Sequence, residues 1–169
     1  MGQWQLIRDV TVQDLAKTYS RLGVKFDEYH GEAMYGKDHI ETVIQRLKDS
    51  GIARELSDGR LVAEISSRPE SEKNSTDENY NKSGEKMGEE DDGRKQVIIV
   101  KRDGTTLYIS RDIAATLDRV VRYNFDKMFY VVENGQSDHF QNLFAITEKL
   151  ENKALNMEHV KFGRIQGMC

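Results

Sequence analysis

The feature that most constrains this chain is a polar segment, residues 66–96, which separates two parts rich enough in apolar side chains to fold. The segment holds the only proline of the chain, Pro69, and just two sizeable apolar side chains, Tyr80 and Met87. It cannot bury enough apolar surface to offset the conformational entropy lost on ordering. We therefore expect a disordered acidic insertion here. Its acidic run could recruit a partner, but the composition favours a solvated spacer.

Residues 1–65 are expected to form a helical and hairpin segment. A T-x-x-D capping box begins at Thr11, and the helix that it opens should end at Gly23. An apolar stripe with helical spacing predicts a second helix that ends at Gly51, and Asp58-Gly59 then predicts a hairpin turn. The apolar positions are Val12, Leu15, Ala16, Tyr19 and Leu22 in the first helix and Ile40, Val43, Ile44 and Leu47 in the second.

Residues 97–169 alternate strand and helix patterns. QVIIV and KMFYVV are typical of strands buried on both faces, Asp103-Gly104 should turn the first of them into a further strand, TTLYI, and HVKFGRI predicts the last strand. Ser110 can cap one helix, and 138–152 reads as another. This order predicts an α/β fold whose parallel strands are joined by right-handed crossovers. The helical apolar positions are Ile113, Leu117, Val120, Val121, Phe140, Leu143, Phe144 and Leu150.

Ligands of such sheets bind beyond the carboxyl ends of the strands, where three segments of this chain should meet: 108–112, 134–139 and 163–168. Asp112, expected in a first helical turn, could face a planar guanidinium, or it could simply stabilise the helix. Gln136 and His139 could bind a polar or anionic group, or they could be ordinary loop and first-turn residues. The residues alone lead no further than an α/β domain with a polar pocket.

Several classes of protein are disfavoured. The net charge of -4 and a pI near 5.6 argue against a free-standing binder of phosphate backbones. Cys169 is the only cysteine, so an intrachain disulfide or a thiolate metal site is excluded. The sequence has no Walker or Rossmann glycine loop, no apolar run long enough for a membrane span and no pattern of a secretory signal. The histidines, which show no metal-binding spacing, are His30, His39, His139 and His159.

Three blocks of the sequence resemble the catalytic domain of the arginyl-tRNA synthetases, the class I arginine–tRNA ligases, and especially its fungal and mitochondrial branch. The blocks are LIRDVTVQDLAKTYSRLGVKFDEYHGEAMYG, DGTTLYISRDIAATLDRVVRYNFDKMFYVV and HVKFGRIQGM, and the pair Gln136-x-x-His139 lies between the last two. The resemblance covers almost everything except the acidic spacer. It implies the C-terminal half of a class I synthetase catalytic domain, a Rossmann-like parallel sheet, for which 97–169 would supply the strands.

The resemblance also implies roles for individual residues. In the family, the tyrosine and aspartate of Y-x-x-R-D and the glutamine ahead of x-x-H bind arginine, whereas positions around the last strand and the KMSKS-like loop line the ATP side. The matching arginine-binding residues here are Tyr108, Asp112 and Gln136. The matching ATP-binding residues are His139, Phe162, Gly163, Ile165, Gly167 and Met168.

The implied reaction is activation of L-arginine by ATP, assisted by Mg²⁺, followed by transfer to tRNA-Arg in the cytoplasm or mitochondria. Contacts to the tRNA would come mainly from other domains. No HIGH-like motif occurs in these residues, and Cys169 stands where the KMSKS-like loop would have serine. We therefore expect an incomplete catalytic domain that is inactive in isolation. The alternative is a catalytically inactive, synthetase-derived module with an interaction or regulatory role.

Overall fold

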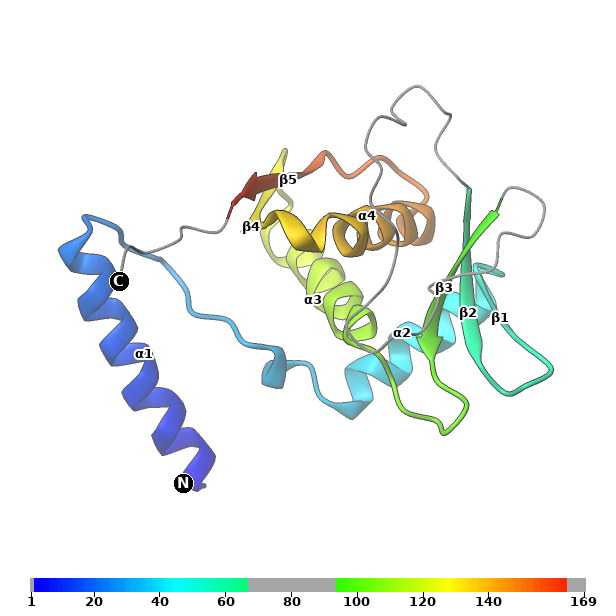
Figure 1. The fold of residues 1–169 in the computed structure, drawn as a ribbon, viewed down its shortest axis with the longest axis horizontal. Helices are drawn as coiled ribbons and strands as arrows, with labels where there is room; N and C mark the ends of the chain where they lie inside the picture. The colour runs from blue at the N-terminus through cyan, green and yellow to red at the C-terminus, as the bar shows by residue number, and fades with distance from the viewer. Residues whose placement is uncertain (1, 67–93, 164–169) are drawn as a thin grey trace. The chain divides into compact units, whose positions relative to one another are not determined.

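The structure is a computed structural model that describes residues 2–66 and 94–163. The chain divides into two compact units, Met1–Met34 and Tyr35–Cys169, which are treated separately below (Figure 1).

The first unit is built on α1, Gln3–Arg21. The capping box predicted at Thr11 is wrong, because the helix starts upstream and the Thr11 hydroxyl donates to the carbonyl oxygen of Ile7 at 2.9 Å. A threonine inside a helix makes this bond to the preceding turn, and the T-x-x-D pattern does not distinguish the two situations. The predicted end is confirmed: Gly23 has φ +72°, the left-handed conformation of a helix C-cap.

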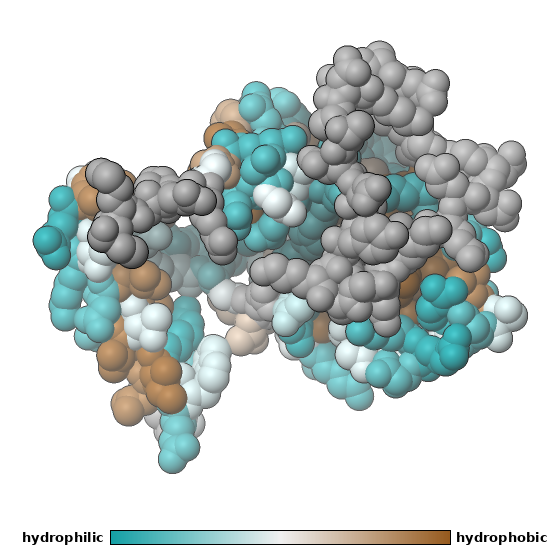
Figure 2. Space-filling view, viewed as in Figure 1, coloured by the Kyte–Doolittle hydropathy of each residue, from teal (hydrophilic) through white to brown (hydrophobic). Residues whose placement is uncertain are grey.

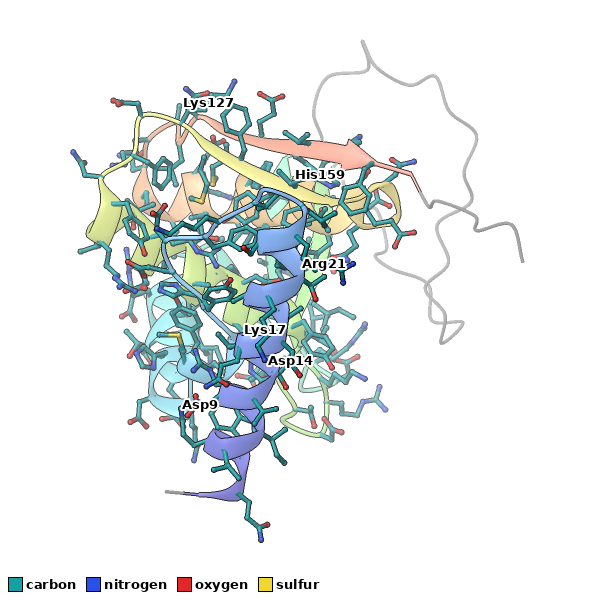
Figure 3. All side chains as sticks on the ribbon, turned by 90° about the vertical axis from the view of Figure 1, so that its left-hand side faces the viewer. Asp9, Asp14, Lys17, Arg21, Lys127 and His159 are labelled. Carbon is teal, nitrogen blue, oxygen red and sulfur yellow. The ribbon has the colours of Figure 1, made fainter. Side chains whose placement is uncertain are left out.

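Beyond α1 the chain folds back along the helix. The Phe26 ring makes edge contacts with Tyr19 at 4.8 Å and Tyr29 at 5.7 Å between centroids. The Arg8 guanidinium donates to the carbonyl oxygen of Tyr29 at 3.0 Å. A short 3-10 helix, Glu32–Met34, ends the unit. Figure 2 shows apolar side chains on α1, where the exposed ones include Trp4, Leu6, Ile7 and Val10, and Figure 3 shows polar ones, Asp9, Asp14, Lys17 and Arg21.

The second unit starts with α2, Lys37–Asp49, which carries the predicted apolar stripe and ends before Gly51 at φ +69°. An antiparallel sheet follows in the order β1-β2-β3, formed by Ala53–Glu55, Leu61–Ser66 and Arg94–Val100. The predicted hairpin at Asp58-Gly59 is confirmed by the β1–β2 pairing. The predicted parallel position of QVIIV is wrong, because β3 pairs antiparallel with β2 across the spacer.

The β2–β3 pairing also redraws the ends of the predicted insertion. Ser66 and Arg94–Gln96, counted in the spacer by composition, lie in strands, and 67–93 lie outside the described residues. Only one face of β3 is buried: Val97 and Ile99 are buried, and Ile98 and Val100 are half-buried.

Both Asp-Gly turns of this unit are held by the same local hydrogen bond. The Asp58 carboxylate accepts from the backbone N–H of Arg60 at 3.0 Å, and Asp103 accepts from that of Thr105 at 2.9 Å. These backbone bonds lower the pKa of both carboxyl groups. The turn at Asp103-Gly104 is therefore confirmed, but the strand TTLYI is wrong: Thr106 forms only an isolated bridge with Val100.

The reason is that a helix begins within TTLYI. It is α3, Tyr108–Tyr123, with Leu107 at its N-cap. Ser110, predicted to cap the helix, is instead fully buried inside the first turn, and its hydroxyl donates to the carbonyl oxygen of Ile99 at 3.2 Å. Of the predicted stripe, Val121 is 81% exposed, and the other three positions are buried.

The rest of the unit follows the predicted order. β4, Met128–Glu133, leads through a 3-10 helix, η2 (Asn134–Gln136), into α4, Ser137–Glu151, and then into β5, Met157–Phe162. β4 and β5 pair in parallel from Met128↔Met157 to Glu133↔Phe162. The expectation that β4 is buried on both faces is wrong for the described residues, because Phe129 and Val131 are exposed.

One core unites these elements. Side chains from α2, the three-stranded sheet, α3 and α4 pack together, among them Leu47, Ile99, Ile113, Leu143 and Ile146, each fully buried. At its edge, Tyr35 is 5% exposed, and its hydroxyl donates to the Asp118 carboxylate of α3 at 2.9 Å. Burial, followed by the hydrogen bond to Asp118 and its charge, raises the pKa of Tyr35 to about 12, while Arg119 and Arg122 oppose the rise.

This tyrosine predicts how stability changes at alkaline pH. Because the pKa of Tyr35 is raised above the unfolded value of about 10, its contribution is fully present below pH 10 and is lost as pH rises toward 12. We expect Tyr35→Phe to cost about 1–2 kcal/mol at pH 7 and to flatten the decline of the unfolding free energy above pH 10. Urea denaturation of both proteins between pH 7 and 11.5 measures this. Parallel alkaline declines would contradict the prediction.

Candidate functional site

The helices α3 and α4 and the strands β4 and β5 define the site. Because each helix runs back against the strand that follows it, the N-termini of both helices lie near the carboxyl ends of the parallel strands. Those ends, Glu133 and Phe162, are register partners. This is the edge at which ligands bind in parallel α/β sheets.

Two predicted site residues are in direct contact at this edge. Nε2 of His139, in the first turn of α4, lies 2.7 Å from Oδ2 of Asp112 on α3. The side chains are 28% and 37% exposed, so solvent reaches both. The placement of Asp112 in a first turn is wrong: α3 starts at Tyr108, and Asp112 lies one turn later. The helix dipole therefore contributes little to its charge, and His139 is its polar neighbour instead.

The other predicted residues lie around this pair. Tyr108 is 68% exposed and occupies the same face of α3 as Asp112, since four positions separate them. Within residues 2–66 and 94–163, no hydrogen bond or ring contact joins it to the other site residues. Gln136 is exposed at the N-cap of α4, and Phe162 and Gly163 are exposed at the end of β5. Ile165, Gly167 and Met168 lie outside the described residues.

The sequence did not predict a partly buried hydrogen-bond chain that runs from Asp112 to the sheet. The hydroxyl of Thr116, a fully buried residue, donates to the carbonyl oxygen of Asp112 at 2.8 Å. Its oxygen therefore accepts from the hydroxyl of Tyr130, on β4, which lies 2.8 Å away. This chain ties the backbone at Asp112 to the sheet. The available signal was a threonine one turn after the aspartate together with a tyrosine inside an otherwise apolar strand.

His159 links the two strands to α4. Its Nε2–H donates to the carbonyl oxygen of Val132 on β4 at 3.0 Å, and its ring lies 4.7 Å from that of Phe140. Its buried Nδ1 has no hydrogen-bond partner among the described residues. Because Phe140 directly follows His139, this packing holds the first turn of α4 against the carboxyl edge of the sheet.

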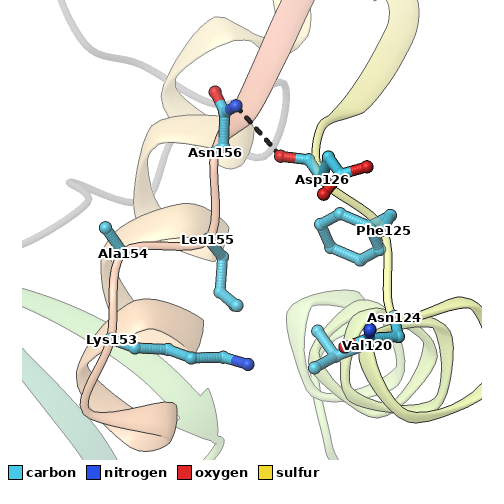
Figure 4. Close-up of a pocket in the computed structure, with 8 residues that line it drawn as sticks. All are labelled: Val120, Asn124, Phe125, Asp126, Lys153, Ala154, Leu155 and Asn156. Atoms are coloured by element: carbon cyan, nitrogen blue, oxygen red, sulfur yellow. Dashed lines mark hydrogen bonds between the residues drawn. The ribbon is translucent and has the colours of Figure 1, made fainter.

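The structure has a pocket at the opposite edge, where the amino ends of β4 and β5 lie (Figure 4). Its volume is about 100 Å³, and it lies between the α3–β4 and α4–β5 connections. The side-chain amide of Asn156 donates to the carbonyl oxygen of Asp126 across it at 3.0 Å. None of the predicted site residues lines it; its lining is Val120, Asn124, Phe125, Asp126, Lys153, Ala154, Leu155 and Asn156.

Within residues 2–66 and 94–163, no group of three or more His, Cys, Asp or Glu side chains could hold a metal ion. Among the same residues, no helix has the length and apolar character needed to cross a membrane.

Comparison with known proteins identifies the class. Residues 1–168 match the family described as tRNA synthetases class I (R), catalytic domain. The chain therefore belongs to the catalytic-domain family of the class I arginyl-tRNA synthetases.

Individual relatives agree. The chain is 34% identical over 169 residues to the Bos taurus protein named "Probable arginine--tRNA ligase, mitochondrial", covering 99% of this chain and 25% of that protein. It is 36% identical over 163 residues to the arginine–tRNA ligase of Lactobacillus acidophilus, covering 96% and 24%. A cytoplasmic arginine–tRNA ligase of Saccharomyces cerevisiae is 31% identical. The chain thus spans about a quarter of the length of these relatives.

Solved structures confirm the fold. The arginyl-tRNA synthetase of Plasmodium falciparum superposes with a TM-score of 0.66 at 25% identity, covering 95% of this chain and 24% of that one. A Campylobacter jejuni structure described as an arginyl-tRNA synthetase gives a TM-score of 0.67 at 18% identity, covering 95% and 30%. The expected fold class, α/β and part of a class I synthetase catalytic domain, is confirmed.

The Thr116–Tyr130 bond yields a test of how Asp112 is supported. We expect Thr116→Val and Tyr130→Phe each to lower the unfolding free energy by about 1 kcal/mol, and the double variant to lose less than the sum, with a coupling of about 1 kcal/mol. Chemical denaturation of the 169-residue chain measures the cycle.

The matched control is Thr42→Val, since Thr42 on α2 makes the same bond to a preceding carbonyl and lies exposed. Its loss should add to that of Tyr130→Phe within about 0.5 kcal/mol. Additive losses for Thr116→Val and Tyr130→Phe would show that their hydroxyls are not coupled.

Proposed function

We propose that this chain is part of the catalytic domain of an arginine–tRNA ligase, which activates L-arginine with ATP and transfers it to tRNA-Arg. The observation that carries the proposal is the Asp112 carboxylate, fixed on a core helix at the ligand-binding edge of the sheet and left 37% exposed. Acyl activation of this kind needs no covalent nucleophile. It needs substrates that are held in line and charge that is stabilised.

The arginine side of the proposed site centres on Asp112. A carboxylate accepts two parallel N–H bonds from a guanidinium, which gives both affinity and geometric selectivity. Tyr108, one turn away on the same helix face, offers a ring against which the guanidinium plane can pack. Gln136, exposed at the start of α4, offers an amide that can donate to or accept from the polar groups of the amino acid.

The ATP side of the proposed site lies at the end of β5. Phe162 and Gly163 are exposed there, and the backbone around them can meet an adenine base. By resemblance, His139, Ile165, Gly167 and Met168 complete this side. Mg²⁺ accompanies ATP in such reactions and binds mainly through phosphate oxygens and water. Among the described residues, no group of three or more His, Cys, Asp or Glu side chains could hold such an ion without the phosphates.

In this catalytic domain, residues 1–65 act as a connective segment and 97–169 as the second half of the nucleotide-binding fold. The insertion between them is reduced from 66–96 to 67–93, because Ser66 and Arg94–Gln96 lie in paired strands. The named relatives include both mitochondrial and cytoplasmic ligases, and we propose one of these two compartments for this protein.

Binding of L-arginine tests the pocket. We expect the 169-residue chain to bind it with a Kd of roughly 1 mM, and Asp112→Asn to weaken binding by about tenfold, because the paired charge is lost. Glu133→Gln removes the same charge from an exposed residue at the end of β4 and should change the Kd by less than about twofold. NMR chemical-shift titration measures all three. Equal losses in both variants would remove Asp112 from the pocket.

A second experiment concerns catalysis by the chain alone. We expect the purified 169-residue protein to show no arginine-dependent ATP–pyrophosphate exchange, because the HIGH motif that flanks the triphosphate in the family does not occur in its sequence. The matched positive control is a full-length arginine–tRNA ligase at the same concentration. Exchange well above the arginine-free background would show that the motif is dispensable.

A further inference from the structure

The contact between His139 and Asp112 connects α4 to α3. It also connects two residues to which the resemblance gives different ligands. The resemblance places Asp112 with arginine and His139 with ATP. In the structure, Nε2 of His139 lies 2.7 Å from Oδ2 of Asp112. No other hydrogen bond from the described residues reaches that carboxylate.

We propose that His139 is a positioning residue for arginine binding: it donates from Nε2 to Asp112 and fixes the plane of the carboxylate that receives the guanidinium. The inference rests on the proposed function, since it takes Asp112 as the guanidinium partner. His139 is thereby assigned to arginine binding, whereas the resemblance assigns it to ATP binding.

The hydrogen-bonding capacity of the two groups permits this arrangement. An ionised carboxylate only accepts, so the ring nitrogen that faces it carries the proton. Each carboxylate oxygen has two acceptor sites, and His139 occupies one of the four. Both oxygens therefore remain able to accept from the guanidinium, and the parallel two-bond geometry is preserved.

Packing against neighbouring aromatic rings holds the His139 side chain in place. Its ring meets Phe140 edge-on, with centroids 5.4 Å apart and planes at 86°. Phe140 is buried and in turn contacts the rings of Tyr130 at 5.0 Å and His159 at 4.7 Å. On the other side, Thr116 holds the backbone carbonyl of Asp112. The carboxylate is thus held through both its backbone and its side chain before any ligand arrives.

The first test needs no ligand. Long-range ¹H–¹⁵N NMR of the 169-residue chain reports which ring nitrogen of His139 carries the proton. We expect the Nε2–H tautomer in the wild type and a clear change of the His139 ring resonances in Asp112→Asn. A ring that carries its proton on Nδ1 alone, or one unchanged by Asp112→Asn, would overturn the proposal whatever happens with arginine.

The second test replaces His139 with side chains that can, or cannot, place an amide N–H at the position of Nε2. Glutamine can place its amide N–H near the position of Nε2, whereas asparagine is too short. We expect His139→Asn to raise the Kd for L-arginine about tenfold and His139→Gln to stay within about threefold of wild type. His39→Asn, at an exposed histidine on α2, is the matched control and should change nothing. The Kd for ATP, measured for the same variants, reports whether His139 also contributes to the nucleotide side.

The outcomes separate the two proposals. If Asp112→Asn weakens arginine binding but His139→Asn does not, the positioning role fails while the pocket survives. Tighter binding by His139→Asn would mean that the imidazole competes with arginine as a cation, and weaker binding of ATP alone would return His139 to the nucleotide side. If Asp112→Asn itself leaves the Kd for arginine unchanged, the pocket fails and the positioning role fails with it.

Discussion

The packing of α3 against α4 decides where the candidate site residues lie. Ile113 of α3 and Leu143 and Ile146 of α4 are fully buried in one core. Burial of a side chain of this size contributes about 1.5–3 kcal/mol, whereas a single hydrogen bond contributes about 0.5–1.5 kcal/mol. Asp112 precedes Ile113, and His139 is one turn ahead of Leu143. The apolar contacts therefore bring the two helices together, and the polar pair at the edge follows from them.

The two parallel strands have apolar side chains on both faces, but the described residues cover only one of those faces. Phe129 and Val131 of β4 and Val160 and Phe162 of β5 are exposed on one face, while Tyr130, Val132 and His159 pack toward the helices. Parallel sheets are covered on both faces, so both faces are built from apolar side chains. KMFYVV has that composition, which is why it predicts burial on both faces. In this unit the prediction is wrong, because one face of β4 is exposed.

Sequence patterns correctly predicted the helices and turns that are determined by residues close together in the chain. The stripe ending before Gly51, the two Asp-Gly turns and the parallel order of β4, α4 and β5 are all as expected. The errors concern partners distant in sequence. Nothing within QVIIV reveals that its partner is β2, across the spacer, nor that Ser110 would be drawn inward to the carbonyl of Ile99. The 2.7 Å contact of Asp112 with His139, 27 residues later, is likewise set by helix packing.

Selectivity for arginine over lysine follows from these constraints in the proposed site. A lysine ammonium is a point charge that a carboxylate accepts from many directions, whereas a guanidinium gains its second bond only when the two planes are aligned. An exposed, freely rotating aspartate would attract both cations. One whose backbone is tied through Thr116 to Tyr130 and whose side chain is bonded to His139 has a defined plane. Discrimination therefore depends on what holds the carboxylate still, and those groups belong to the core of the fold.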